Sequence, residues 1–477
     1  MTFDPLKATL RAVLGATLAW WCLVALAPAL PAQASRVSAQ GKPLDAARER
    51  PKATLEVPYR LFVLENGLTV ILHRDASVPV VSLNVWYHVG SANERPGRTG
   101  FAHLFEHLMF EGSQHVKEGE FDRLLESAGA NNNGSTNNDR TNYYIDMPAN
   151  ALELGLFLES DRMAYLLDTM SPERVNGQRD VVKNERRQSY DNRPYGMASL
   201  QLDTMLWPAG HPYSWPTIGN MEDLSAASYE DVVAFFKKYY VPNNASLVIA
   251  GDIELDRTQA LVKKWFGAIP AGAPVEPIAP PTAHLISVSR KTMTDKVQLA
   301  RLHLGWLTPR QFAPGDAALD VVSSILADGK NSRLYKRLVY DTQMAQDVSA
   351  YQQGGALGSS FLIVATARPG TRIEDIQAVI DEELDRLRRE PPESREVQRA
   401  VNQIEASFYR QMERVGSYRG KAEQLNAYFA AGGGPDFFAE DLARYTSLTA
   451  ADVQAAVLRW LPAGRRVELV VQPEATP

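Results

Sequence analysis

The chain has few of the residues that redox centres and thiolate metal sites require. Its 477 residues include a single cysteine, Cys22, and eight histidines. Cys22 lies in an apolar N-terminal run, and cleavage of that run would leave a protein with neither a disulfide nor a thiolate ligand. Any metal site in the remaining chain must therefore use histidine and carboxylate side chains.

Long apolar runs are equally scarce, since only residues 12–30 approach the length that spans a bilayer. Lys7 and Arg11 precede this run, and an Ala-Gln-Ala sequence ending at Ala34 follows it. This pattern predicts a secretory signal peptide that is cleaved after Ala34. An uncleaved membrane anchor is the alternative, although prolines near the end of the run favour cleavage. We therefore expect a periplasmic or secreted protein with no stable membrane anchor after cleavage.

An excess of positive charge is also missing. The chain has 50 lysines and arginines against 56 aspartates and glutamates, which gives a net charge of −6. Because nucleic-acid surfaces are usually basic, this mild acidity argues against a nucleic-acid partner. Hydrophobic residues make up 45% of the chain, which is enough for substantial cores, and the length indicates about two to three domains.

A proline-rich stretch, residues 270–281, is typical of a stiff linker and leaves two parts of similar length on either side. We expect five segments in the chain. They are a signal peptide, a flexible arm, an N-terminal domain, a linker and a C-terminal domain, over residues 1–34, 35–56, 57–269, 270–284 and 285–477 respectively.

The two halves end in a similar way. Residues 223–249 and 441–471 both predict a helix, a short polar turn and a β-strand. This order favours an internal duplication, with chance similarity of two common units as the alternative. We predict an α+β fold of two homologous α/β-sandwich-type domains, each with a mixed or antiparallel sheet and helices packed on it.

The motif that carries chemistry is His103-Leu-Phe-Glu106-His107. On a helix, residues four positions apart share a face, so His103 and His107 can supply two corners of a zinc tetrahedron. Glu106 would then lie beside the metal, in the inverted order of the better-known His-Glu-x-x-His motif. The alternative is an amphipathic helix with apolar residues in the core and two histidines at its edge.

A catalytic zinc site needs a third protein ligand. The best carboxylate candidate is Glu185, in a segment that Ser171 and Pro172 mark as the start of a helix running to about residue 191. Periodicity alone does not distinguish Glu185 from an ordinary glutamate paired with nearby arginines.

These residues together resemble the insulinase/pitrilysin family of inverted zinc metallopeptidases. The resemblance covers nearly the whole mature chain, and the length of two units is similar to the short, two-domain type found in bacterial periplasmic members and mitochondrial processing peptidases. It implies that His103, His107 and Glu185 bind Zn²⁺ and that Glu106 is the general base. Further similarities lie at residues 64–68, 89–91, 142–144, 218–219, 240–244 and 251–252.

The resemblance also implies where a peptide substrate binds. An edge strand containing Asn133, Gly134 and Ser135 would accept the peptide as an additional strand. A flexible polar loop is the alternative, because an Asn-Asn-Asn-Gly sequence by itself predicts a turn. Gln178 occupies the position of a supporting glutamate in many family members, and its amide can hydrogen-bond a ligand without adding charge.

A second departure from the family pattern concerns an arginine and a tyrosine, seven residues apart, that hold the substrate and its oxyanion. Their positions fall on Val339 and Gln346. We therefore expect a homologous, zinc-less subunit to supply this pair. The resemblance implies a zinc metalloendopeptidase acting on peptides as the catalytic subunit of a heterodimer. A non-catalytic assembly subunit and a metal- or peptide-binding module remain alternatives.

Overall fold

A computed structural model describes residues 55–474. The expected signal peptide, Cys22 and nearly all of the expected arm lie outside the described residues. None of the helices within residues 55–474 is long and apolar enough to cross a membrane.

The first half of the chain forms a six-stranded sheet in which β2 and β6 are parallel and all other neighbours are antiparallel. Strand β4 is at one edge, where it pairs with β5. In order across the sheet, the strands are β1 (Arg60–Val63), β2 (Thr69–Arg74), β6 (Ala245–Gly251), β3 (Val80–Tyr87), β5 (Thr141–Pro148) and β4 (Asn131–Thr136).

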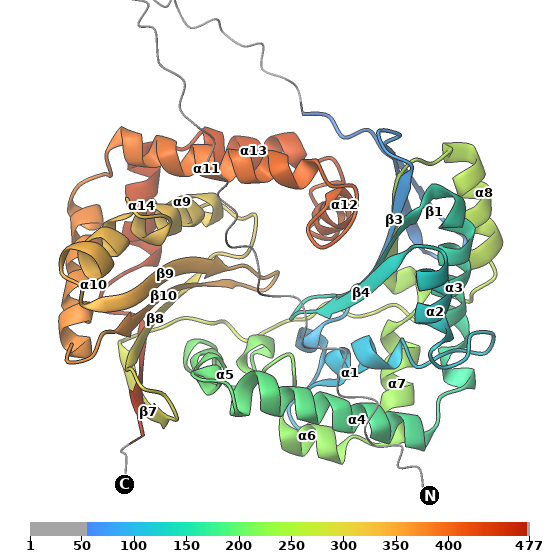
Figure 1. Cartoon of the computed structure of the whole chain (residues 1–477), viewed down its shortest axis with the longest axis horizontal. Helices are drawn as coiled ribbons and strands as arrows, with labels where there is room; N and C mark the ends of the chain where they lie inside the picture. The colour runs from blue at the N-terminus through green and yellow to red at the C-terminus, as the bar shows by residue number, and fades with distance from the viewer. Residues whose placement is uncertain (1–54, 475–477) are drawn as a thin grey trace, which may run out of the picture. The chain divides into compact units, whose positions relative to one another are not determined.

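Helices of the first half pack on one face of this sheet (Figure 1). Alternate residues of β5, Tyr143, Ile145 and Met147, enter the same core as Leu104 and Phe105 of α1, because side chains of a strand alternate between its faces. These helices are α1 (Phe101–Leu108), α2 (Glu120–Ser127), α3 (Leu152–Tyr165), α4 (Pro172–Arg186), α6 (Met221–Ala226), α7 (Tyr229–Tyr239) and α8 (Leu255–Phe266). Helix α5 (Gly196–Leu206) instead shares a core with Val467 and Leu469 of the second half.

The second half forms a five-stranded sheet with its own core. Across this sheet, the strands are β7 (Ser289–Asp295), β11 (Val467–Pro473), β8 (Arg301–Thr308), β10 (Ser359–Ala367) and β9 (Ala345–Gln353). Its helices are α9 (Asp316–Ala327), α10 (Ile373–Arg389), α11 (Ser394–Met412), α12 (Lys421–Ala430), α13 (Phe438–Thr446) and α14 (Ala450–Trp460).

The two sheets share one topology. Without β1, the order β2-β6-β3-β5-β4 matches β7-β11-β8-β10-β9 strand for strand in chain order, and each sheet has one parallel pair, between its first and last strands in the sequence. The predicted α+β fold of two related units, each with a mixed sheet and packed helices, is confirmed. The expected boundaries at residues 57–269, 270–284 and 285–477 stay predictions.

Helix α12 belongs to the second half but packs on the first sheet. Its residues Leu425 and Tyr428 share a core with Ile71 of β2 and Val248 of β6. Leu72, the neighbour of Ile71, faces the core that contains α1. Because neighbouring side chains of a strand point to opposite faces, α1 and α12 cover opposite faces of the first sheet.

Candidate metal centre

Helix α1 is anchored by its apolar face. Phe101, Leu104, Phe105 and Leu108 are at most 3% exposed, and this places the histidines and Glu106 of the motif on the opposite side of the helix. The helix starts at Gly100, which has a left-handed backbone with φ of 90° and no side chain that could cap the first turn.

Glu94 supplies the missing cap for α1. One carboxylate oxygen accepts the backbone N–H of Gly100 at 2.9 Å, and the other accepts that of Ala102 at 2.8 Å. An acidic group at a helix N-terminus satisfies free N–H groups and interacts favourably with the helix dipole. No local sequence pattern marks Glu94 as a cap, because it lies six residues before Gly100, outside the usual capping positions.

Helix α4 brings Glu185 to the motif. Ser171 accepts the backbone N–H of Arg174 and Pro172 is the first helical residue, as their sequence predicts. Helix α4 ends at Arg186, and a π-helical turn over Arg187–Asp191 follows it. The regular α-helix is therefore five residues shorter than the predicted helix to residue 191.

Three side chains converge where α1 and α4 meet. Oε2 of Glu185 lies 3.3 Å from Nε2 of His107 and 3.7 Å from Nε2 of His103. The three donor atoms all lie within 4.8 Å of one another, and no other such group of His, Cys, Asp or Glu side chains occurs among residues 55–474.

This donor set fits zinc. Two atoms bound to one zinc ion at about 2.0–2.1 Å in a tetrahedral arrangement lie about 3.3 Å apart, close to both measured separations. Two imidazoles and one carboxylate also leave the fourth position free for water, as a catalytic site requires. The two ring nitrogens of His103 have different surroundings. Nε2 faces Glu185, whereas Nδ1 is buried and has no hydrogen-bond partner within residues 55–474.

The charges at the site favour metal binding. Burial lowers the pKa of His103 to about 4, with the neighbouring His107 adding to the shift and Glu185 opposing it. A hydrogen bond from His107 is the main cause of a lowered pKa at Glu185. A neutral imidazole and an ionised carboxylate are the forms that bind a metal ion.

Glu106 has the environment of a general base. Burial raises the pKa of its carboxyl, while a hydrogen bond from Thr136 and the charges of His107 and Arg140 oppose the rise. A raised pKa lies closer to neutral pH, and a general base transfers protons best when its pKa is near the pH at which it works.

The residues expected to bind a peptide form strand β4. Asn133, Gly134 and Ser135 pair with Tyr144, Tyr143 and Asn142 of β5. A Cβ atom added at Gly134 would lie 3.1 Å from Cγ of Glu106, so glycine allows the strand to pass close to this carboxylate. One side of β4 pairs with β5, and its position at the sheet edge leaves the other side for an added strand.

Gln178 contacts a carboxylate that belongs to no motif of the sequence. Its amide nitrogen donates to Glu111 at 2.5 Å. Burial raises the pKa of Glu111, whereas the charges of Arg174 and His107 and the hydrogen bond from Gln178 oppose the rise. A carboxylate is therefore present beside Gln178, but it comes from the segment after α1.

The positions expected for the arginine and tyrosine pair have other surroundings. Val339 packs against the core of the second half, and Gln346 is exposed on β9. The nearby arginines are engaged in ion pairs, at 2.7 Å between Arg333 and Glu396 and at 2.6 Å between Arg337 and Glu382.

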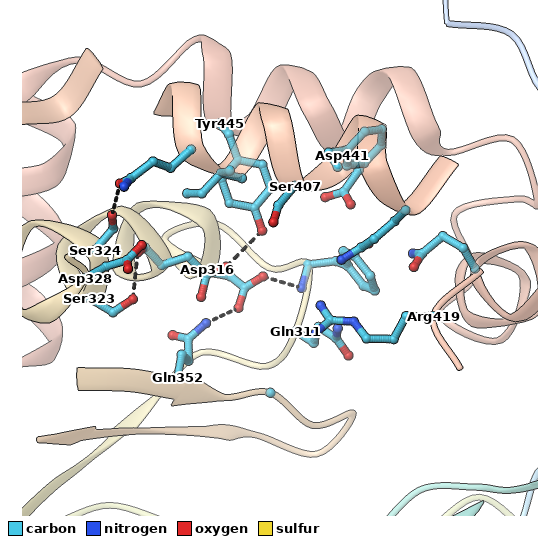
Figure 2. A pocket seen from close by; sticks show the side chains of 18 of the residues that line it. Gln311, Asp316, Ser323, Ser324, Asp328, Gln352, Ser407, Arg419, Asp441 and Tyr445 are labelled. Carbon is cyan, nitrogen blue, oxygen red and sulfur yellow. Dashed lines mark hydrogen bonds between the residues drawn. The ribbon is translucent and has the colours of Figure 1, made fainter. Parts of the chain in front are cut away.

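A separate cavity of about 710 Å³ lies in the second half. Polar side chains of α9, β9 and α13 line it, including Asp316, Gln352, Asp441 and Tyr445 (Figure 2), and Asp320 of α9 lines it as well. None of the residues predicted to bind metal or peptide lines this cavity.

Comparisons with known proteins match both halves. Residues 69–206 match the family model described as insulinase (peptidase family M16), and residues 226–404 match the peptidase M16 inactive domain. A zinc protease, PqqE, of Helicobacter pylori is 31% identical over 333 residues, which are 68% of this chain and 74% of the relative. An uncharacterized zinc protease of Streptomyces coelicolor is 26% identical over 86% of this chain and 89% of its own length.

Solved structures share the fold. A protease from Helicobacter pylori superposes with a TM-score of 0.80 and 26% identity over 87% of this chain and 100% of the other chain. The periplasmic protease PqqL from Escherichia coli has a TM-score of 0.72 at 18% identity, and the match covers 87% of this chain and 47% of PqqL.

Proposed function

The chain belongs to the insulinase family of peptidases, M16, and on this premise we propose that it is a zinc metalloendopeptidase and the catalytic subunit of a heterodimer. One observation carries the proposal. His103, His107 and Glu185 place three donor atoms within 4.8 Å of one another, and Glu106 lies between the two histidines in the sequence.

The roles of the residues follow from their chemistry. A bound zinc ion would supply a Lewis acid that lowers the pKa of water and polarises a peptide carbonyl. His103, His107 and Glu185 would hold the ion. Glu106 would take the proton of the attacking water and transfer it to the leaving amine. Asn133, Gly134 and Ser135 would bind the peptide backbone along β4, and Gln178 would support the site through Glu111.

A second subunit would complete the site. Val339 and Gln346 do not supply the guanidinium and the phenol of the family pattern, because one is apolar and packed on the core and the other is an exposed amide on β9. The length of PqqL supports a two-unit arrangement, since this chain matches 47% of that protein. We infer that a homologous zinc-less subunit contributes the missing arginine and tyrosine. A periplasmic or secreted location follows from the predicted signal peptide and is supported by the periplasmic PqqL.

Substitution of Glu106 tests the mechanism. We expect Glu106→Gln to retain zinc, because the three ligands remain, and to lose hydrolysis by at least about 100-fold. Zinc content by atomic spectroscopy and cleavage of a mixed peptide library are the two measurements. Glu126→Gln, an exposed glutamate of α2, is the matched control. Undiminished cleavage by the Glu106→Gln protein would contradict the assigned mechanism.

A binding or assembly subunit without turnover is the second candidate. It is favoured by the match of residues 226–404 to a domain described as inactive. Under this alternative, the wild-type chain and Glu106→Gln would bind zinc and peptides equally, and neither would cleave the library in the presence of the partner.

A further inference from the structure

The β4–β5 hairpin is held in place at its turn. Arg140 follows the turn and bends its guanidinium back onto β4, where Nη1 donates to the Ser135 carbonyl oxygen at 2.7 Å and to its hydroxyl at 2.6 Å. The ring centroid of Trp86 lies 5.2 Å from Cζ of Arg140. Since Arg140 is only 8% exposed, it fixes a backbone oxygen of β4 in a largely dry environment.

The second half of the chain supplies a charge for Arg140. Oε1 of Glu423, on α12, lies 3.5 Å from Nη2 of Arg140 and accepts the amide of Asn142 at 3.4 Å. The backbone N–H of Arg419 donates to the other carboxylate oxygen. Burial lowers the pKa of Arg140, and the charge of Glu423 is the largest influence that opposes this. Glu423 therefore stabilises the ionised form of Arg140.

A second contact reaches the same turn. Oδ2 of Asp139 accepts the backbone N–H of Ala356, in the turn between β9 and β10, at 3.0 Å. Its other oxygen accepts the hydroxyl of Tyr213 at 2.5 Å. The second half thus contacts the hairpin at two consecutive residues, Asp139 and Arg140.

The contact between Arg140 and Ser135 lies one residue along β4 from Gly134, the residue that passes close to Glu106. Ser135, held by Arg140, directly follows Gly134, where an added Cβ would lie 3.1 Å from Cγ of Glu106. A displacement of Ser135 would therefore move the strand relative to the general base and change the edge to which a peptide is added.

We propose that Glu423 is a positioning residue of the second half, which acts through Arg140 to hold β4 in place against Glu106. The consequence for catalysis rests on the proposed function, whereas the consequence for β4 itself does not. Helix α12 would then have a task beyond packing, because its docking would order the strand that receives the substrate.

Amide hydrogen exchange of the metal-free protein tests the proposal directly. In Glu423→Gln, we expect the amides of residues 131–136 to exchange at least about fivefold faster, because a buried charge-assisted contact is weakened. The zinc-loaded enzyme with its partner should show a KM raised by a similar factor and unchanged zinc content. Asp139→Asn, which weakens the second contact, should also speed exchange in this strand.

Lys421→Met is the matched control. Lys421 is also on α12 and forms an ion pair with Asp75, which follows β2, and three strands separate β2 from β4. This variant should leave exchange in β4 and KM unchanged. Equal effects of Lys421→Met and Glu423→Gln, or no effect of either, would overturn the proposal. Absence of cleavage by the wild-type enzyme would count against the proposed function only, and the exchange data would still decide the role of Glu423.

Discussion

At the scale of single residues, the carboxylate of Asp320 on α9 is buried beside the hydroxyl of Tyr445. Tyr445 donates to its carboxylate at 2.8 Å at the wall of the cavity in Figure 2. Burial raises the pKa of Asp320 to about 7, the neighbouring Asp316 adds to the rise, and the hydrogen bond from Tyr445 opposes it. The folded protein therefore keeps a proton that the unfolded chain loses near pH 4.

This difference gives a pH-dependent contribution to stability. Between about pH 4 and 7, the unfolded state binds fewer protons at Asp320, so the free energy of unfolding falls as the pH rises. We expect Asp320→Asn to remove this fall in the free energy of unfolding, because an amide does not titrate. The variant should be more stable than the wild type at pH 8 by about 1–2 kcal/mol, and no more stable at pH 4. Thermal unfolding at both pH values measures the effect.

Asp328→Asn provides the comparison for this prediction. Asp328 lines the same cavity but is exposed, so its substitution should change the stability equally little at both pH values. A gain in stability of the same size from both variants would show that cavity charge in general, and not the buried Asp320, sets the effect.

At the scale of the element, α1 depends on a cap that comes from outside the helix. The helix has eight residues, and two of the three proposed zinc ligands, His103 and His107, lie within them. Glu94 accepts two N–H groups at its start. The orientation of His103, one turn from this end, therefore depends on a carboxylate outside the proposed ligand set.

Removal of this cap should weaken zinc binding. We expect Glu94→Ala to destabilise the first turn of α1 by about 1–2 kcal/mol and to lower zinc affinity by about five- to thirtyfold, measured by competition with a chelator. Glu94→Gln, which keeps one acceptor oxygen, should lose less. Glu120→Ala removes a carboxylate from the first turn of α2 and should leave the affinity unchanged. Wild-type affinity in Glu94→Ala would refute the role of the cap.

At the scale of the whole molecule, the two halves share a topology but differ in what their sites carry. The first half has the group of His103, His107 and Glu185. In the second half, the positions expected for the arginine and tyrosine pair hold Val339 and Gln346. The arginines near Val339 are held in ion pairs. On the proposed function, a single copy of this chain would hold the zinc ligands and the general base but not the arginine and tyrosine pair.

We accordingly expect the purified chain alone to cleave peptides poorly. Co-expression with a homologous zinc-less subunit, such as one encoded by a neighbouring gene, should raise kcat/KM by at least about 100-fold, because oxyanion stabilisation is restored. The peptide-library assay with and without the second subunit is the measurement. Glu106→Gln paired with the same subunit controls for activity of the partner. Full activity of the isolated wild-type chain would rule out the heterodimer.

Much of the fold could be read from local sequence. The start of α4 at Ser171 and Pro172 and the apolar face of α1 depend on interactions within a few residues, which the sequence specifies directly. The similar ends of the two halves predicted a duplication, and the matching strand orders of the two sheets agree with it. The motif of His103, Glu106 and His107 and its chemistry also follow from spacing along a single helix.

Contacts between distant segments needed the tertiary structure. Spacing alone left Glu185 an ordinary glutamate, until the packing of α4 on α1 brought it to 3.3 Å from His107. The polar sequence of residues 131–134 predicted a turn as readily as a strand, and pairing with β5 decides for the strand. The contact between Arg140 and Glu423 joins residues 283 positions apart. Sequence thus determined the elements and the two-histidine motif, whereas packing decided which side chains meet, because long-range contacts depend on strand order and helix docking that no local pattern encodes.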